Sequence, residues 1–306
     1  MLATLLTLMG AAAAGAFVTD SFRNEAEDEP SQDNTSDEET GQVTDYIDLT
    51  GEDPEDGEEA APTEERDIIF GDEEADYIDG AGGDDHIEGD GGADILIGGA
   101  GEDMIHGNDE ADRINGGPDD DHLYGHNDDD VIIGGDGDDR MGGGGGDDLL
   151  LGEAGNDRLS GDGGDDRLVG GAGTDTLFGG FGNDTLDGRD GARDFLNGGA
   201  GEDRLLTDGS DLMHGGSGAD TFVVDTSGEE AGASGGPSHI QDFNVEEDRI
   251  LIVYDAEGPA PSVDLRPTET GTELRADGTT LARIDHDGPL TLDRIDIVAS
   301  DSEEAA

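Results

Sequence analysis

A nine-residue period governs residues 67–224 and constrains the fold more than any other feature. An aspartate begins each period, at Asp67, Asp76, Asp85, Asp94, Asp103, Asp112, Asp121, Asp130, Asp139, Asp148, Asp157, Asp166, Asp175, Asp184 and, after small slips, Asp194, Asp203, Asp211 and Asp220. Two residues after every aspartate stands an apolar residue, from Ile69 to Phe222. Because only 31% of the chain is apolar, eighteen consecutive matches would arise by chance with a probability on the order of 10⁻⁹. The period therefore indicates a repeated structural unit and argues against a disordered low-complexity tract.

A glycine-rich loop of six positions ends at each aspartate. Residues 170–175 and 179–184 show it best, and the unit reads Gly-Gly-x-Gly-x-Asp-x-apolar-x. Glycine takes positive φ values freely, so the loops can turn tightly with their carbonyl groups pointing into one space. The first loop position is glycine in sixteen of seventeen loops, and Thr207 is the exception. The last three residues of each unit predict a short strand whose middle side chain faces inward.

This unit resembles the hemolysin-type calcium-binding nonapeptide of repeats-in-toxin (RTX) proteins. The resemblance implies an all-β fold, a parallel β-roll, with calcium bound in the glycine loops. We expect a right-handed β-solenoid in which two units form one turn, so that alternate loops stack along opposite edges. An ice-binding solenoid would instead show an outward column of one residue type, and the third loop position from Glu73 to Asn127 shows none.

The loop chemistry favours a hard cation. Carbonyl groups and carboxylates form an all-oxygen site, and about seven ligands from flexible loops suit calcium better than magnesium, which requires a stricter octahedron. The predicted metal ligands are the aspartates that end the loops: Asp76, Asp85, Asp94, Asp103, Asp112, Asp121, Asp130, Asp139, Asp148, Asp157, Asp166, Asp175, Asp184, Asp194, Asp203, Asp211 and Asp220. One Ca²⁺ between each loop and the next on the same edge gives about fifteen ions as an upper estimate.

Four loops depart from the pattern at their fourth position. This position is glycine in most units but acidic in four, namely Glu74, Glu110, Asp119 and Asp128. Residues other than glycine take a left-handed backbone conformation less readily. We therefore expect weaker calcium binding in the loops that end at Asp76, Asp112, Asp121 and Asp130 than in those that end at Asp139 to Asp184.

Charge limits the possible partners. The chain has 81 acidic residues against 14 basic ones, all of them arginine, and a net charge of −67. Self-repulsion of this size opposes compaction, so metal binding would supply folding free energy; fifteen Ca²⁺ ions would leave about −37. Nucleic acid and anionic membrane surfaces are not expected as partners, because the sequence has no basic patch. The absence of cysteine excludes disulfides and leaves calcium as the extracellular staple.

Two segments precede the repeats. Residues 1–19 are apolar and alanine-rich, but they lack the basic residues of a signal peptide and are slightly short for a membrane anchor. Export, anchoring, a mistaken start codon and a disordered terminus all remain open, and any membrane contact would use residues 1–18. Residues 20–66 have the composition of a disordered acidic linker. Within it, residues 43–49 alternate like a strand and predict a cap or docking strand.

Residues 225–306 predict a small C-terminal β capping domain. Strand patterns occur at 239–243, 248–254 and 292–298, and a hairpin is expected at 273–284 around the turn 276–278. The region resembles the short β-domain that follows the repeats in type I secreted proteins, where an Ile-x-Asp-Phe segment precedes an Asp-Arg-Ile strand. This resemblance implies an uncleaved C-terminal export signal, the type I secretion machinery as a partner, and an extracellular or cell-surface location. An exposed solenoid end also needs a lid, which this domain can supply.

The sequence contains no enzyme motif in the structural context that such a motif requires. The seven histidines form no His-Glu-x-x-His pair, and most of them are expected to be solvated. Residues 232–236 match Gly-x-Ser-x-Gly by letter, but no helix pattern follows. We therefore predict a secreted or surface calcium-dependent structural or binding protein without enzymatic activity. The alternative is a hydrolase or toxin-type accessory protein with an unrecognised site in the C-terminal region.

Overall fold

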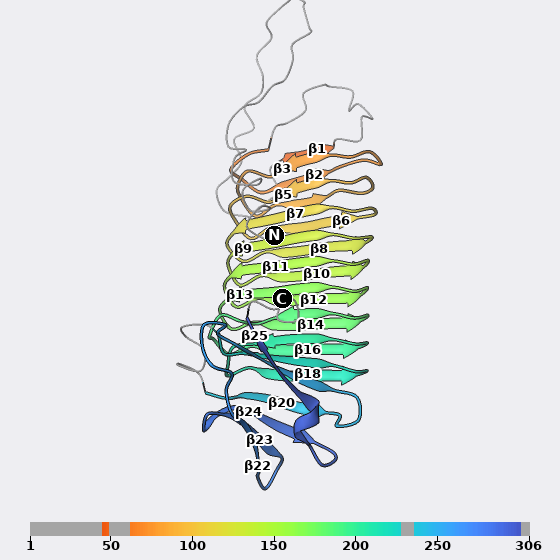
Figure 1. Cartoon of the computed structure of the whole chain (residues 1–306). Coiled ribbons are helices and arrows are strands. Elements are labelled where there is room, and N and C mark those ends of the chain that lie inside the picture. Colours follow the sequence, from red (N-terminus) through yellow and green to blue (C-terminus); the bar gives the residue numbers. More distant parts are fainter. Residues whose placement is uncertain (1–44, 49–61, 228–235, 301–306) are drawn as a thin grey trace, which may run out of the picture. The chain divides into compact units, whose positions relative to one another are not determined.

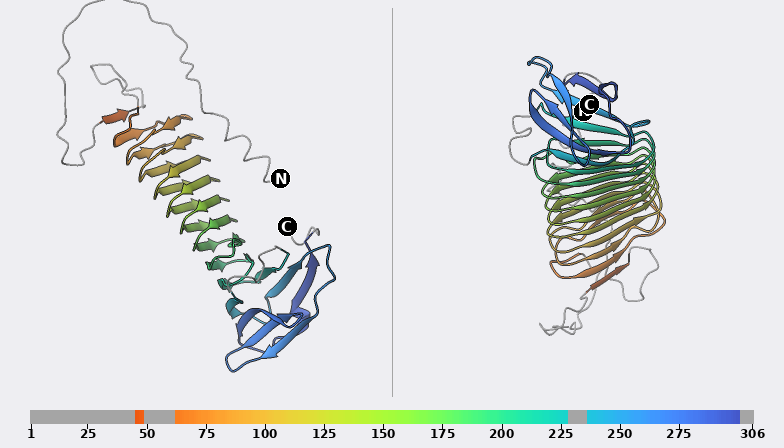
Figure 2. Two further views of the ribbon diagram at one scale, coloured as in Figure 1. Left: turned by 90° about the vertical axis from the view of Figure 1, so that its left-hand side faces the viewer. Right: turned by 90° about the horizontal axis from the view of Figure 1, so that it is seen from below.

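The computed structural model describes residues 45–48, 62–227 and 236–300, and these residues belong to one compact unit, residues 41–306. The described residues form strands and one 3₁₀ turn, η2 (Leu292–Arg294), and contain no α-helix. Figure 1 shows the strands stacked as rungs, and Figure 2 shows the same stack from two other sides. The predicted all-β solenoid is confirmed.

The strands alternate between two parallel sheets. The first sheet contains β2 (Asp67–Phe70), β4 (His86–Glu88), β6 (Met104–Asn108), β8 (His122–Asn127), β10 (Arg140–Gly145), β12 (Arg158–Gly163), β14 (Thr176–Phe181), β16 (Phe195–Ala200) and β18 (Leu212–Ser217). The second contains β3 (Tyr77–Asp79), β5 (Ile95–Ile97), β7 (Arg113–Pro118), β9 (Val131–Asp136), β11 (Leu149–Ala154), β13 (Arg167–Ala172), β15 (Thr185–Asp187), β17 (Arg204–Thr207) and β19 (Thr221–Asp225). Two repeats therefore form one turn, as predicted.

The register follows from the repeat length. In the pairing of β10 with β12, Met141 lies beside Leu159, so neighbouring rungs of one sheet are eighteen residues apart. One unit is a residue longer, ending at Asp194, and a later one is a residue shorter, ending at Asp211. Leu177 pairs with Leu196 nineteen residues later and Leu196 pairs with Met213 seventeen residues later, so the loops absorb the extra and the missing residue and the apolar residues stay aligned.

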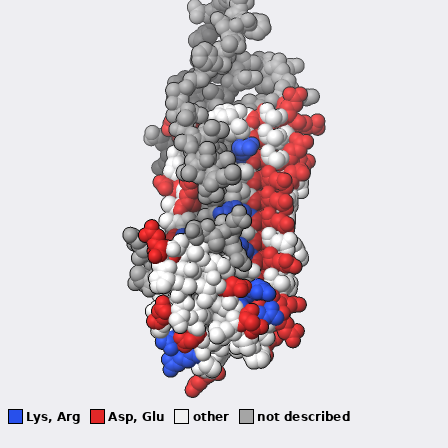
Figure 3. All heavy atoms as spheres, viewed as in Figure 1, with Lys and Arg blue, Asp and Glu red and all other residues white. Residues whose placement is uncertain are grey.

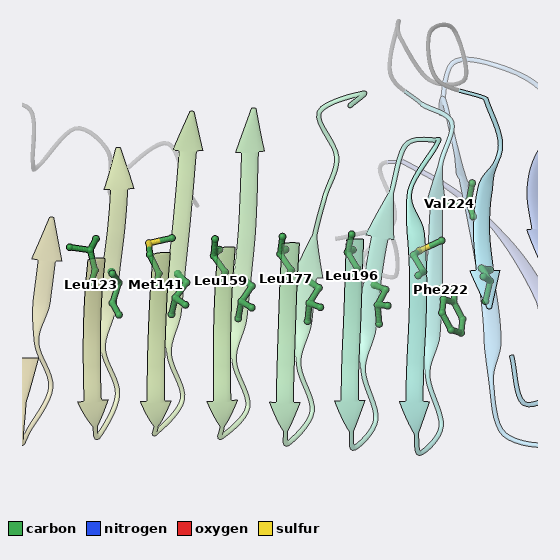
Figure 4. Close-up of a cluster of buried hydrophobic side chains, with 14 of the residues drawn as sticks. Leu123, Met141, Leu159, Leu177, Leu196, Phe222 and Val224 are labelled. Carbon is green, nitrogen blue, oxygen red and sulfur yellow. The ribbon is translucent and has the colours of Figure 1, made fainter. Parts of the chain in front are cut away.

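The core is a single inward column from each sheet. Each of the eighteen apolar residues two positions after an aspartate is buried, with exposed fractions from 0% to 3%. Figure 4 shows Leu123, Met141, Leu159, Leu177 and Leu196 stacked between the sheets. Because each turn contributes only two such side chains, the interior is thin and apolar burial per residue is low. The fold therefore needs cohesion from its loops as well.

The strands extend further than the sequence pattern predicted. Ten of the strands in the roll, β7 to β14, β16 and β18, contain six residues, because the pairing continues into the first loop positions. In one example, Gly144 pairs with Asp162 as well as Met141 with Leu159. Hydrogen bonds join the loops as well, since the Gly155 N–H donates to the Ala172 carbonyl oxygen at 2.9 Å. The loops are thus part of the parallel ladder and are held in stacked register.

The segments on either side of the repeats extend the same sheets. Strand β1 (Asp45–Asp48) pairs in parallel with β2, where the sequence predicted a docking strand at 43–49. After the repeats, β20 (Ser238–Phe243) pairs with β18, and β21 (Arg249–Tyr254) pairs with β19. The expected strands 239–243 and 248–254 are therefore present. Residues 1–19 and most of the linker lie outside the described residues.

The remaining C-terminal strands complete the two sheets. The predicted hairpin is present as β23 (Thr272–Ala276) and β24 (Thr279–His286), and an unpredicted strand, β22 (Val263–Pro267), pairs with β23. Strand β24 runs parallel to β20, and β25 (Ile295–Ala299), which follows η2, runs parallel to β21. The hydrogen-bonded sheets thus continue past residue 225.

Candidate metal centre

Two ladders of aspartates follow the two edges of the roll. The backbone N–H of each aspartate donates to Oδ1 of the aspartate one turn later, at 2.7–3.0 Å. One ladder runs through Asp67, Asp85, Asp103, Asp121, Asp139, Asp157, Asp175, Asp194 and Asp211. The other runs through Asp76, Asp94, Asp112, Asp130, Asp148, Asp166, Asp184, Asp203, Asp220 and Asp248. The predicted aspartates therefore lie in two rows, one along each edge of the roll, and consecutive units contribute to opposite edges.

The second carboxylate oxygen of the ladder residues is unpartnered. Among the described residues, fourteen aspartates have a buried Oδ2 atom with no hydrogen-bond donor: Asp85, Asp94, Asp103, Asp112, Asp121, Asp130, Asp139, Asp148, Asp157, Asp166, Asp175, Asp184, Asp194 and Asp203. Leaving a buried charged acceptor without a partner costs several kcal/mol. Fourteen such atoms in regular array indicate a partner of positive charge, and a divalent cation fits this requirement.

The glycine at the first loop position lies directly beside the unpartnered oxygen. A Cβ atom at Gly152 would lie 2.4 Å from Asp157 Oδ2 and 2.2 Å from the carbonyl oxygen of Gly170 in the next turn. At Gly80, the corresponding distances to Asp85 Oδ2 and the Gly98 carbonyl oxygen are 2.5 and 2.6 Å. A side chain at this position would therefore collide with both oxygens. A carboxylate oxygen and a carbonyl oxygen of successive turns thus face the same small space.

The donor set is dominated by the backbone. In the part of the chain that the structure describes, no three His, Asp or Glu side chains converge closely enough to hold a metal ion. Carbonyl oxygens of neighbouring loops must therefore complete any coordination shell around the aspartate Oδ2 atoms. All-oxygen shells with flexible geometry suit calcium. This agrees with the expectation that carbonyl groups and carboxylates act together.

Burial raises the pKa of the ladder carboxyls. Desolvation is the largest cause, and it raises the pKa of Asp85 to about 7 and of Asp121 and Asp194 to about 8. The backbone hydrogen bond to Oδ1 lowers these values, and neighbouring aspartates raise them further. A carboxyl in this position is ionised at neutral pH only at a cost, unless a cation is bound beside it. The ladders therefore couple proton binding to cation binding.

At all four ends of the ladders, protein donors take the place of a cation. At the first end of each ladder, the Thr63 N–H donates to Asp67 Oδ2 at 2.8 Å and the Asp72 N–H donates to Asp76 Oδ2 at 2.9 Å. At the last ends, the Thr207 hydroxyl donates to Asp211 Oδ2, and the Asn244 N–H donates to Asp248 Oδ2 at 2.7 Å. The unpartnered oxygens thus lie between residues whose carboxylates are already satisfied.

The seventeen predicted ligands differ in whether a protein donor contacts their Oδ2 atom. Asp76 and Asp211 have protein donors on Oδ2, whereas the fourteen residues from Asp85 to Asp203 have none. Asp220 is buried, accepts a hydrogen bond from Asp203 and lies against Gly215 in the same way. Asp248, which sequence reasoning did not include, extends one ladder beyond the repeats. Its signal was the run Asp248-Arg249-Ile250, which repeats the Asp-x-apolar pattern outside the nine-residue register.

Three of the four atypical loops have a strained backbone. Glu110, Asp119 and Asp128 occupy the fourth loop position with φ values of 75°, 84° and 68°. Glycine takes this conformation freely, whereas other residues pay of order 1–3 kcal/mol. Glu74, in the fourth atypical loop, is absent from the described non-glycine residues with positive φ. Glu153 and Asp162, at the second position of the loops that end at Asp157 and Asp166, also have positive φ values of 74° and 70°, so the expected order of calcium affinities stays a prediction.

At least two cavities border the C-terminal strands in the described part of the chain. The first has a volume of about 620 Å³ and is lined by His239, Asp285 and Ser210, among others, and the second has a volume of about 520 Å³. The His239 Nε2 atom lies 2.9 Å from Asp285 Oδ2. The Ser210 hydroxyl donates to the Ala192 carbonyl oxygen at 2.7 Å, so it is oriented by the backbone and not by His239. This arrangement lacks the oriented nucleophile that a serine hydrolase requires.

An all-β solenoid with two edges of unpartnered carboxylate oxygens defines a metal-binding β-roll. The family described as "RTX calcium-binding nonapeptide repeat (4 copies)" matches residues 63–96, 70–105, 106–141, 142–177, 160–193, 169–205 and 190–222. These matches together cover residues 63–222, more than half of the 306 residues. The chain therefore belongs to the family of RTX calcium-binding nonapeptide repeat proteins, and its repeats form a calcium-binding β-roll.

Two solved structures are similar to parts of the chain. The extracellular lipase LipA from Serratia marcescens is 16% identical with a TM-score of 0.21, and the match covers 56% of this chain and 40% of the lipase. The AlgE6R3 subunit of the Azotobacter vinelandii mannuronan C5-epimerase is 23% identical with a TM-score of 0.20, covering 62% of this chain and 84% of that subunit. The match thus spans less than half the length of the lipase. No curated protein matches the chain.

Proposed function

We propose that this protein is a secreted or cell-surface structural or binding protein whose β-roll folds when it binds extracellular calcium. The main support is the array of fourteen buried Oδ2 atoms without a donor. A cation beside each one would remove a desolvated charge that the thin apolar core cannot offset. Folding and calcium binding would then be one equilibrium, and the chain would stay expanded where free calcium is scarce.

The proposed ligands are the aspartates with unpartnered oxygens. One cation for each of these atoms gives fourteen ions, close to the upper estimate of about fifteen from the loop count. Asp85 to Asp203 in the two ladders would provide the carboxylates, and Asp220 extends the second ladder. Asp76 and Asp211 would bind calcium weakly or not at all, because protein donors occupy their second oxygen.

The chain would divide its tasks among four segments. Residues 1–19 and the C-terminal region are the two candidate export elements, and residues 20–66 link the first to the roll. Residues 67–224 bind calcium, and residues 225–306 cover the last rung of both sheets as a lid. The lid is supported by β20 and β21, which pair with β18 and β19 and so protect strand edges that would otherwise be exposed.

A chelator experiment tests calcium-dependent folding. Circular dichroism of the full chain near pH 8 should show little β-structure in excess EGTA and a cooperative gain on adding millimolar Ca²⁺. The hydrodynamic radius should fall in the same transition, and Mg²⁺ at equal concentration should not replace Ca²⁺ because it keeps its octahedral water shell. An unchanged β-rich spectrum in excess chelator would refute the proposal.

Export is tested by two deletions in the producing cell. Type I export predicts that removal of residues 277–306 leaves the protein inside the cell, whereas removal of residues 1–19 leaves secretion unchanged. The reverse result would assign export to the N-terminal segment. Among the described residues, no helix is long and apolar enough to cross a membrane.

A further inference from the structure

The larger of the two cavities lies where the last turns of the roll meet the C-terminal strands. Three parts of the chain line it: the loops before β16, β18 and β20, the neighbouring strands β20 and β24, and the turn between β22 and β23. None of the lining residues is an aspartate of the calcium ladders. Its volume of about 620 Å³ is typical of sites for small molecules, which measure about 300–1,000 Å³.

Two arginines line this cavity in a chain that has only 14 basic residues against 81 acidic ones. Arg193 lies in the loop before β16, and Arg283 lies on β24. Among the described residues, four other arginines form ion pairs with carboxylates, whereas Arg193 and Arg283 form none. Glu273 lies opposite Arg283 on β23, but its carboxylate pairs with Arg266 at 3.9 Å. Both guanidinium groups are therefore available to a ligand.

The cavity carries a net positive charge. Asp285 is the one acidic residue of the lining, and its Oδ2 atom lies 2.9 Å from His239 Nε2. With histidine counted as neutral, two arginines and one aspartate leave one positive charge. One negative charge on a ligand would balance it.

The loops along this edge change character toward the cavity. On the other edge, the residue before the ladder aspartate is still acidic at Glu202 and Glu247. On this edge, the same position is occupied in chain order by Asp84, Glu102, Asp120, Asp138, Asn156, Thr174, Arg193 and Ser210. The acidic column of this edge thus ends before the cavity, and an anion meets less repulsion there than beside the earlier loops.

The remaining wall of the cavity is a hydroxyl-bearing turn in a fixed position. A Cβ atom at Gly271 would lie 2.2 Å from the Ile284 carbonyl oxygen, so the turn packs directly on β24. The Thr268 N–H donates to the Gly271 carbonyl oxygen at 2.9 Å, and the Gly271 N–H donates to the Thr268 hydroxyl at 3.1 Å. The Thr268 hydroxyl keeps its own proton to donate, and Thr270 adds a second hydroxyl to the lining.

We propose that this cavity binds a small hydroxylated molecule with one carboxylate, of the sugar-acid type, at a site separate from the calcium ladders. Arg193 and Arg283 bind the carboxylate, because a guanidinium presents paired N–H donors that match its two oxygens. Thr268 and Thr270 donate to hydroxyl groups of the same molecule. A phosphate monoester fits less well, since its charge of about −1.5 to −2 exceeds that of the lining.

Saturation-transfer NMR of the calcium-saturated full chain tests this site with gluconate as the probe. Sorbitol is the matched control ligand, because it has the same polyhydroxyl chain with a hydroxymethyl group in place of the carboxylate. Gluconate should give a saturable signal at millimolar concentrations, and sorbitol should give none. Arg193→Gln and Arg283→Gln should each weaken gluconate binding at least about tenfold through loss of a charged hydrogen-bond donor.

Arg113→Gln is the matched control variant. Arg113 is exposed and, like Arg193, lies directly beside a ladder aspartate, but it begins β7 in the other sheet and does not line the cavity. Gluconate binding should be unchanged in this variant. Calcium-induced circular dichroism of each variant should match that of the unmodified chain, and Arg283→Gln, which lies outside the repeats, decides the test if Arg193→Gln alters calcium binding.

Four results would overturn the proposal. The first two are absence of a saturable gluconate signal and an equal signal from sorbitol. The third is unchanged affinity in both cavity variants, which would place gluconate on bound calcium. The fourth is an equal loss in Arg113→Gln, which would show a general effect of net charge.

Discussion

At the scale of single residues, Thr207 explains an exception in the repeat. It is the one first-position residue that is not glycine, and its hydroxyl donates to Asp211 Oδ2. The Thr207 oxygen also lies 2.9 Å from the Ser238 hydroxyl oxygen, at the junction of the roll and the C-terminal strands. A hydroxyl group here satisfies the carboxylate that a cation would satisfy elsewhere, so the substitution marks the end of a ladder.

Thr207→Val should therefore destabilise the calcium-loaded protein by about 1–3 kcal/mol, because it leaves a buried carboxylate oxygen without its donor. Urea unfolding in saturating calcium measures the change. Thr176→Val is the matched control, since Thr176 begins β14 and is not buried, and it should change stability by less than about 0.5 kcal/mol. Equal effects of the two substitutions would show that the hydroxyl is not needed.

Gly161 and Gly163 provide a test within one loop. A Cβ at Gly161 would lie 2.1 Å from Asp166 Oδ2, whereas a Cβ at Gly163 would come no closer than 3.8 Å to its nearest neighbour, and Gly163 does not need a positive φ. Gly161→Ala should destabilise the loaded protein by about 1–3 kcal/mol through overpacking and remove about one bound Ca²⁺. Gly163→Ala should change neither quantity. Calcium stoichiometry and thermal unfolding of both variants check this. Equal calcium stoichiometry and equal stability of the two variants would contradict the role of Gly161 beside Asp166 Oδ2.

At the scale of the loop and strand, the atypical loops differ in backbone strain. Glu110 has a left-handed backbone at φ of 75°, and Glu74, at the same loop position, does not have a positive φ. The distinction was invisible in the sequence, where both are glutamates at position four. Replacing Glu110 by glycine is therefore expected to stabilise the protein more than the same change at Glu74.

Glu110→Gly should raise the free energy of unfolding in saturating calcium by up to about 1 kcal/mol. Relief of left-handed strain, of order 1–3 kcal/mol, exceeds the entropy cost of a glycine, about 0.5–1 kcal/mol. Glu74→Gly removes the same charge without relieving positive φ, so it should be neutral or destabilising. Chemical denaturation compares the two, and a larger gain at Glu74 would argue that charge and not backbone conformation limits these loops.

At the scale of the whole molecule, charge is segregated. Figure 3 shows acidic side chains in a column along one edge of the roll. The outward positions of β5, β9 and β11 are aliphatic instead, with Ile95, Val131 and Leu149 among them. On this face the acidic side chains therefore gather where the loops stack, and cations bound there neutralise them most effectively.

The buried carboxyls predict opposite pH dependences with and without calcium. In chelator, the folded chain has Asp pKa values raised to about 6 for Asp148, about 7 for Asp157 and about 8 for Asp194, against about 3.9 in the unfolded chain. The folded state then binds more protons between about pH 4 and 8, so stability falls as pH rises through this window. With saturating calcium, protons compete with the cation and stability should rise with pH instead.

Circular dichroism between pH 5 and 8, in EGTA and in calcium, measures both dependences. The metal-free chain should contain more β-structure at pH 5 than at pH 8. The calcium concentration needed for half-maximal folding should be higher at pH 5. A metal-free chain that gains structure as pH rises would contradict the assignment of raised pKa values to the ladder.

The sequence alone determined the repeat, the inward column from Ile69 to Phe222, two units per turn and most of the C-terminal strands. The features of the repeat follow from local periodicity, because each nine-residue unit contains its own turn, its own strand and its own inward residue, and the C-terminal strands follow from local strand and turn patterns. Only the tertiary structure decided which carboxylates are unpartnered, that Thr207 and Asn244 end the ladders, that Asp248 continues one of them, and that Arg193 and Arg283 line one cavity. The ladder contacts join residues 17 to 28 positions apart in the chain, and a local pattern cannot specify which partner occupies the next turn. Thr207 and Asn244 lie only four residues before Asp211 and Asp248, but the nine-residue pattern does not show which carboxylate oxygen they reach.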